Sequence, residues 1–244
     1  PLTVQNTAPT LESVSIDPAE GPRSQNFTCS ANTLLDADPD DLPSVAYSWF
    51  LSLPNGSATL LEGEVEPTLS GQVFNPGDLL TCRGTPSDGT LEGEPQLSDP
   101  TLIINLPPGA PTPTLSPTVA TVTDAFSCSV DDVQDTEGDL LTLEYRWWVN
   151  DAPAPTVLSA ETTASDLGAH GGDVIRCEVR AADAWDSSPW GTSALVTLDN
   201  TPPSGGTVTV SPQSPKEEDP LTCEVTGAVD LDGDPLSWDV SWTV

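Results

Sequence analysis

Three cysteines of this chain are each followed by acidic residues at the same spacing. The acids stand seven, nine and eleven residues after the cysteine in every case. The triplets are Asp36, Asp38 and Asp40 after Cys29; Asp135, Glu137 and Asp139 after Cys128; and Asp230, Asp232 and Asp234 after Cys223. Carboxylates at alternate positions of a loop provide the hard oxygen ligands that Ca²⁺ prefers. The spacing therefore predicts three loops of one geometry, each suited to a cation.

A further acid follows a second cysteine in the first two copies of this pattern. Asp88 lies six residues after Cys82, and Asp183 lies six residues after Cys177. If these acids share one end of the domain with the triplets, three or four carboxylates converge there. Such a group would repel itself without a cation. Soft ligands are not nearby, so zinc and copper fit poorly.

The loop differs from the EF-hand calcium loop. Asp230, Asp232 and Asp234 match its first three ligands, but Pro235 stands where the turn glycine belongs. Ser241 stands where the loop would need its bidentate glutamate. The alternative to a metal site is that Asp and Gly simply build the turns, as they do in many loops.

The elements that must position these loops also recur. The leading cysteines are separated by 99 and then 95 residues, which indicates a tandem repeat. Apolar residues alternate around each cysteine, and a second alternating segment carries a tryptophan 19 or 20 residues later: Trp49, Trp147 and Trp242. A period of two predicts half-buried strands with these side chains pointing inward. We expect domains at residues 1–106 and 107–200, and the N-terminal part of a third at 201–244.

The remaining pattern is typical of an all-β chain. Twenty-six prolines and 18 glycines mark many turns. The Cys…Trp…Cys order on alternating strands resembles the immunoglobulin-like β-sandwich. This resemblance implies tandem sandwiches with intra-domain bridges between strands B and F, Cys29 with Cys82 and Cys128 with Cys177.

Cys223 has no mate within the chain. By the repeat arithmetic, its mate would lie beyond residue 244, so one interpretation is that the chain stops inside a third domain. The other interpretation is a bridge to another molecule. If residue 244 is a true end, a neighbouring identical chain would have to complete the third sandwich by strand addition.

The sequence also resembles bacterial extracellular repeat proteins with Ig-like, cadherin-like or polycystic-kidney-disease-type domains. The residues that carry this resemblance are Asn6-Thr7-Ala8-Pro9, the Asp230–Asp234 loop and the Tyr/Trp strand after it. Antibody domains are a poorer match, because Leu80 and Ile175 stand where those domains have a tyrosine. The cadherin-like resemblance implies a structural Ca²⁺ beside a linker, with Asn105 and Asp199 as further ligands.

The composition disfavours two classes of partner. The formal net charge is −32, which opposes binding to nucleic acid and to anionic membranes. The acidity alone is also consistent with a high-salt habitat. Cysteines spaced for bridges indicate an oxidising compartment, so we expect a secreted or cell-surface protein.

No set of residues suggests catalysis. The single histidine, His170, stands beside two glycines and fits a solvent-facing turn. We therefore expect no enzyme and no catalytic residue. Trp185 and Trp190 occupy a loop whose counterpart in the first copy has no aromatic residue. They are candidate contacts for a glycan or a surface protein; packing against a neighbouring linker is the alternative.

These observations predict an extracellular structural or adhesive segment that forms a stiff, calcium-stabilised stalk or filament. Its partners would be neighbouring repeats or identical chains. The alternative is a carbohydrate- or protein-binding accessory module of a larger secreted enzyme that uses Trp185 and Trp190.

Overall fold

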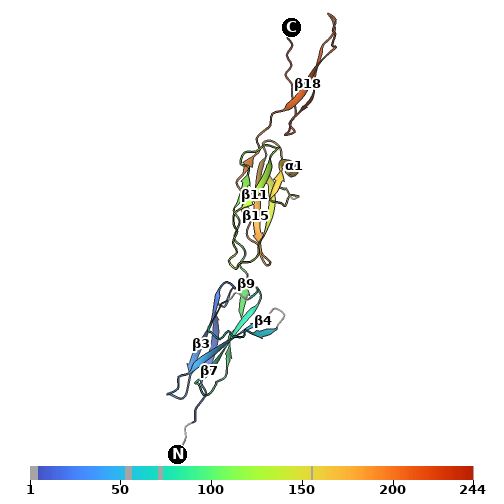
Figure 1. Cartoon of the computed structure of the whole chain (residues 1–244). Coiled ribbons are helices and arrows are strands. Elements are labelled where there is room, and N and C mark those ends of the chain that lie inside the picture. Colours follow the sequence, from blue (N-terminus) through green and yellow to red (C-terminus); the bar gives the residue numbers. More distant parts are fainter. Residues whose placement is uncertain (1–4, 53–56, 71–73, 155, 244) are drawn as a thin grey trace, which may run out of the picture. The chain divides into compact units, whose positions relative to one another are not determined.

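The chain forms two compact units (Figure 1). The computed structural model describes residues 5–52, 57–70, 74–154 and 156–243. The first unit comprises Pro1–Pro108, Asp135–Leu140 and Asp183–Asp186. The second comprises Gly109–Gln134, Leu141–Ala182 and Ser187–Val244. The domain bounds expected from the repeat remain predictions.

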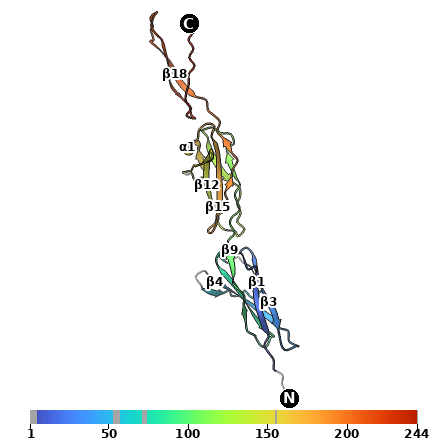
Figure 2. The same cartoon turned by 180° about the vertical axis from the view of Figure 1, so that it is seen from behind.

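The first unit contains two sheets. The smaller sheet has the order β1 (Thr10–Asp17), β3 (Asn26–Leu35), β6 (Thr68–Ser70). The larger has the order β2 (Glu20–Pro22), β9 (Thr101–Ile104), β7 (Leu79–Ser87), β4 (Ser44–Ser52), β5 (Ala58–Leu60), and β8 (Gln96–Leu97) also pairs with β7. The pair β2 and β9 is parallel, whereas the other strand pairs of this unit are antiparallel. Figure 2 shows β1 beside β3 from behind.

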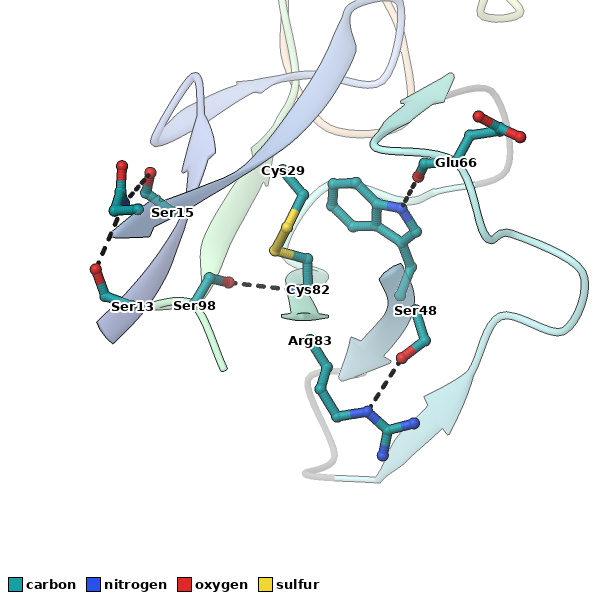
Figure 3. The surroundings of a disulfide bond; sticks show 10 residues. Ser13, Ser15, Cys29, Ser48, Glu66, Cys82, Arg83 and Ser98 are labelled. Atoms are coloured by element: carbon teal, nitrogen blue, oxygen red, sulfur yellow. Dashed lines mark hydrogen bonds between the residues drawn. A yellow bond between two sulfur atoms is a disulfide. The ribbon is translucent and has the colours of Figure 1, made fainter. Parts of the chain in front are cut away.

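A disulfide crosses the core of this unit. Cys29 on β3 and Cys82 on β7 are bonded, with their Cα atoms 6.2 Å apart. Both side chains are buried because alternate residues of the two strands face inward. The buried Trp49 donates from Nε1 to the Glu66 carbonyl at 2.9 Å. Figure 3 shows Ser98 beside Cys82, whose N–H donates to the serine hydroxyl at 3.1 Å.

The second unit has the same plan. One sheet has the order β10 (Pro113–Ser116), β11 (Ala125–Val130), β14 (Glu161–Thr163). The other has the order β13 (Ala152–Ala154), β12 (Thr142–Val149), β15 (Val174–Ala182), β16 (Gly191–Thr192), and β17 (Val196–Thr197) also pairs with β15. A short helix, α1 (Ala164–Leu167), follows β14 and is capped by the Thr163 hydroxyl.

The core of the second unit repeats the contacts of the first. Cys128 and Cys177 are bonded, again with a Cα separation of 6.2 Å. Trp147 is fully buried and donates from Nε1 to the Ser159 carbonyl at 2.9 Å. The Cys177 N–H donates to the Ser193 hydroxyl at 3.1 Å. The predicted fold class is therefore confirmed: an all-β chain with immunoglobulin-like sandwiches and disulfides between their B and F strands.

The third copy of the sequence pattern forms a hairpin of β18 (Ser204–Ser211) and β19 (Thr222–Val229). The strand predicted through Val240 and Trp242 does not form; these side chains are 52% and 53% exposed. Its third predicted inward residue, Val244, lies outside the described residues. A strand needs a partner for its N–H and C=O groups. In the other two copies that partner is β7 or β15, and the third hairpin has no equivalent strand among the described residues.

Two glycines are required by a close approach of the backbone. A Cβ atom on Gly93 would overlap the carbonyl oxygen of Pro9, and one on Gly191 would overlap that of Pro111. We expect Gly191→Ala to lower the free energy of unfolding by about 1–3 kcal/mol, the usual cost of overpacking. Denaturant unfolding would measure this. Leu195→Ala, at a position 63% exposed, is the control and should change stability by less than about 0.5 kcal/mol. Equal effects of the two changes would contradict the steric argument.

Candidate metal centres

The second acidic loop, residues 135–140, gathers three carboxylates. Asp135, Glu137 and Asp139 each offer an oxygen, and these oxygens lie within 4.8 Å of one another. Asp135 shapes the loop, because its Oδ1 accepts the N–H of Glu137 at 2.7 Å and that of Asp139 at 3.3 Å. Such side-chain-to-backbone bonds are how Asp organises a turn.

Two linker residues make hydrogen bonds to acidic side chains of the first unit, one in this loop and one at Asp183. The Leu106 N–H donates to Oε2 of Glu137 at 2.7 Å. Asn105 donates from Nδ2 to Oδ2 of Asp183 at 3.0 Å. Burial alone would raise the pKa of Asp183, but the hydrogen bonds from Asn105 and from the N–H groups of Asp186 and Trp185 outweigh it and lower the pKa. Asp183 therefore stays ionised and fixes the Asn105 amide.

Three buried oxygens in this loop region have no hydrogen-bond partner among the described residues. They are Oδ2 of Asp135, Oδ2 of Asp139 and Oδ1 of Asn105. Buried polar atoms are nearly always paired, and an unpaired one costs about 1–3 kcal/mol. All three atoms are acceptors of the hard oxygen type that Ca²⁺ binds. The donor set, carboxylate and amide oxygen, fits Ca²⁺.

The first loop, residues 36–41, uses a different third acid from the one predicted. Asp36, Asp38 and Asp41 bring oxygens within 4.8 Å of one another, whereas Asp40 is exposed and lies outside this group. Oδ2 of Asp36 is buried and unpartnered. The pKa of Asp41 is raised by desolvation, followed by the negative charges of Asp36 and Asp88. The neighbouring carboxylates therefore disfavour the ionised form of Asp41, as the sequence predicted for a cluster of acids.

The linker before the first sandwich makes the same contacts as the linker before the second loop. The Thr7 N–H donates to Oδ2 of Asp38 at 2.7 Å, and Asn6 donates from Nδ2 to Oδ2 of Asp88 at 2.9 Å. Hydrogen bonds from the N–H groups of Leu91 and Thr90 hold the pKa of Asp88 well below its usual range. Asp88 and Asp183 thus have one role: each binds its own turn and the linker asparagine.

The third loop, residues 230–234, lies in the second unit. Asp232 is 3% exposed, and its Oδ2 accepts both the N–H and the hydroxyl of Thr201 at 2.5 Å. Its Oδ1 is buried without a partner. Asp230 accepts the N–H groups of Asp232 at 2.9 Å and Asp234 at 3.3 Å. Among the described residues, only the first two loops bring three carboxylates within 4.8 Å of one another.

Each copy has a linker asparagine, and of these only Asn105 was predicted as a candidate ligand. Asn6, Asn105 and Asn200 each lie 23 residues before the leading cysteine of their copy. This spacing identifies Asn200, rather than the predicted Asp199, as the equivalent linker residue of the third copy. Asp199 is exposed, and its N–H donates to the Ala120 carbonyl at 2.7 Å.

The two loop tryptophans have different surroundings. Trp185 is 46% exposed, and the guanidinium of Arg23 lies 5.6 Å from its ring centroid. Trp190 is half-buried, with the guanidinium groups of Arg146 at 4.0 Å and Arg180 at 4.9 Å from its ring centroid. These cations cover the ring on which a sugar would have to stack.

Trp190 is part of a longer stack on one sheet of the second unit. The guanidinium groups of Arg146 and Arg176 lie 5.5 Å and 4.6 Å from the ring centroid of Trp148. The order is therefore Arg176, Trp148, Arg146, Trp190, Arg180. Glu178 pairs with Arg146 and Arg176, Glu144 with Arg180, and Asp151 with Arg176. Three arginines and three acids make this stack electrically neutral.

The comparisons with known proteins give fold likeness alone. No family model and no curated protein matches the chain. It is similar to the solved structure of a Ca²⁺-stabilised adhesin with which an Antarctic bacterium binds ice, at 14% identity and TM-score 0.33, over 85% of this chain and 52% of that one. It is also similar to a two-domain fibronectin type III segment of chicken tenascin, at 10% identity and TM-score 0.39, over 77% and 99% of the two chains. Domains A168–A170 of titin match at 11% identity and TM-score 0.32, over 78% and 60%.

This chain thus spans about half the length of the adhesin chain that it matches. No helix in the part of the chain that the structure describes is both long enough and apolar enough to cross a membrane. The chain's membership of a particular repeat family therefore stays an expectation, while its sandwich architecture stands on its own strands and disulfides.

Proposed function

We propose that this chain is an extracellular structural or adhesive segment whose acidic loops bind Ca²⁺. The observation that carries the proposal is the set of buried, unpartnered oxygens beside the second loop, on Asp135, Asp139 and Asn105. A carboxylate or amide oxygen withdrawn from water needs a donor or a cation. These oxygens have no hydrogen-bond donor among the described residues.

The ligand set favours calcium over other divalent cations. Ca²⁺ accepts six to eight oxygens in irregular arrangements, whereas Mg²⁺ demands a near-ideal octahedron and gives up its water reluctantly. Asp135, Glu137 and Asp139 would supply carboxylate oxygens, and Asn105 an amide oxygen. The loop offers no thiolate or imidazole, which zinc and copper prefer.

The ion would act on the linker as well as on the loop. Leu106 and Thr7 contact the second and first acidic loops, and the preceding asparagines, Asn105 and Asn6, bind Asp183 and Asp88. An ion shared by the loop carboxylates and the linker amide would join the two segments. The segment would therefore be stiffer with calcium than without it, as suits a spacer or stalk.

Two disulfides support the extracellular assignment, because such bridges persist in oxidising compartments. The alternative of a glycan-binding module is less favoured, because guanidinium groups cover Trp190. Only Trp185 of the two loop tryptophans keeps a large exposed surface. Neighbouring repeats or identical chains remain the proposed partners.

The test is thermal unfolding of the chain in calcium and in chelator. At a free calcium concentration 100-fold above Kd, binding should add about 2.7 kcal/mol to the free energy of unfolding. For a domain of this size, the unfolding midpoint should rise by roughly 10–20 °C. The variant Asp135→Asn/Asp139→Asn should lose the part of this gain that belongs to the second loop.

The control separates binding from screening. Sodium chloride at matched ionic strength also weakens repulsion among the acids. If it raises the midpoint as much as calcium does, the acidic loops respond to salt alone and the calcium proposal is wrong.

A further inference from the structure

Arg23 gives the second loop a positive charge that the other loops lack. It stands six residues before Cys29, and the residues at the same position of the other copies are Val122 and Glu217. Among the described residues, no Arg or Lys forms an ion pair with the acids of the first or third loop.

The contacts of Arg23 involve both its backbone and its side chain. Its N–H donates to Oε1 of Glu137 at 3.1 Å. Its guanidinium donates from Nη2 to Oδ1 of Asp139 and has Nε 4.0 Å from Oε1 of Glu137. The Glu137 side chain is fully buried, and those of Asp139 and Arg23 are 11% and 17% exposed. A charge pair this shielded is screened little by salt.

Trp185 completes the group. The Trp185 ring lies under the Arg23 guanidinium. The backbone N–H of Trp185 donates to Oδ1 of Asp183 at 2.7 Å. The first copy has Thr90 at the corresponding place, two residues after Asp88. Arg23 and Trp185, each peculiar to its own copy, therefore meet at one loop in the first unit.

The first loop provides the contrast within the same unit. Asp36, Asp38 and Asp41 form a similar cluster, with oxygens within 4.8 Å of one another and no Arg or Lys paired with them among the described residues. The second loop has the guanidinium of Arg23 beside two of its three acids. Opposite charge at this distance offsets the repulsion that would otherwise open the loop.

We propose that Arg23 is a resident cation that keeps the second loop closed without metal, so that calcium controls the order of the first loop but not of the second. This inference rests on the proposed function for its calcium half, since it concerns the regulation of the same sites. Oδ1 of Asp139 is bound by Arg23 while Oδ2 is left unpartnered. The arginine therefore orients a ligand and leaves the metal-facing oxygen open.

Hydrogen exchange of the whole chain, read by mass spectrometry in excess calcium and in chelator, tests this. Peptides covering residues 36–41 should exchange at least about tenfold faster in chelator than in calcium, whereas those covering 135–140 should exchange at similar rates in both. In Arg23→Gln, the 135–140 peptides should become at least about tenfold faster in chelator and should be slowed again by calcium.

Arg83→Gln is the matched control. Arg83 lies in the same unit, where its guanidinium stacks on Phe50 at 5.1 Å and donates from Nε to the Ser48 hydroxyl at 3.1 Å. The Arg83→Gln variant should leave the hydrogen exchange of both loops unchanged. A gain-of-function variant is Val122→Arg, because Val122 and Asp232 line one cavity of the second unit. Val122→Arg should slow the exchange of residues 230–234 in chelator.

The outcomes separate the two proposals. If calcium alters exchange neither in the wild type nor in any variant, the proposal that the loops bind calcium is wrong. The proposed role of Arg23 is then tested by the exchange rates in chelator alone. The inference about Arg23 is overturned if the wild-type second loop exchanges in chelator as fast as the first. It is equally overturned if Arg23→Gln leaves exchange at 135–140 in chelator unchanged.

Discussion

Replacement of Trp147 by alanine is expected to remove a large share of the stability of the second unit. The indole is fully buried and its Nε1 donates to the Ser159 carbonyl. Truncating a buried tryptophan costs about 3–5 kcal/mol through lost burial and the cavity left behind. Domains of this kind have a total stability of about 5–15 kcal/mol. Denaturant unfolding followed by far-ultraviolet circular dichroism would measure the loss.

The control for this change is built into the chain. Trp242 has the same spacing from its cysteine as Trp147, yet it is 53% exposed. We expect Trp242→Ala to change stability by less than about 0.5 kcal/mol. If both changes were equally costly, or both harmless, burial would not explain the role of the tryptophan.

Loss of the Cys128–Cys177 bridge is expected to have an effect of similar size. The bridge closes a loop with a sequence separation of 49. In the chain-entropy model such a loop stabilises the fold by about 4 kcal/mol, because it restricts the unfolded chain. The double variant Cys128→Ala/Cys177→Ala should therefore lower the melting midpoint by roughly 15–30 °C. Calorimetry would measure this shift.

Cys223→Ala supplies the comparison, because Cys223 is a free, half-buried thiol. It should leave the midpoint of the main transitions within a few degrees of wild type. A destabilisation as large as that of the double variant would point to cavity formation, rather than loss of the cross-link, as the source of the effect.

The strands that carry the disulfides and tryptophans could be predicted because their signal is strong and local. Around Cys29, Cys82, Cys128 and Cys177, alternate residues are apolar, and the structure buries the same residues. The edge strands β5, β6, β13 and β14 were not predicted. Each has three residues and at most one buried side chain, so no period of two can be recognised.

The acidic loops were predicted as sequence patterns but not in full detail. A fixed spacing suggested Asp40 as the third acid of the first loop, whereas the loop turns so that Asp41 joins Asp36 and Asp38. Loop geometry depends on φ and ψ at each turn residue, which periodicity does not report. The linker contacts also depend on tertiary structure, although the spacing of Asn6, Asn105 and Asn200 would have predicted them.

The arginine and tryptophan stack could not be predicted from local spacing. Arg146 and Trp148 lie on β12, Arg176 and Arg180 on β15, and Trp190 after it. The partners meet only because Arg146 stands opposite Glu178 in the strand register. Cross-strand register is set by the whole sheet, so a single segment does not reveal it.

The parallel pairing of β2 with β9 bears on how the first unit would respond to traction. Glu20, Gly21 and Pro22 pair with Leu102, Ile103 and Ile104, so an early and a late strand of the sandwich run side by side. Pulling the ends of this unit apart would slide these strands along each other and load their hydrogen bonds together, instead of peeling them one after another. In the described part of the second unit, the parallel pairing is a single bridge, between Ala120 and Leu198. Under tension, the second unit would therefore yield first and act as the extensible element of the pair.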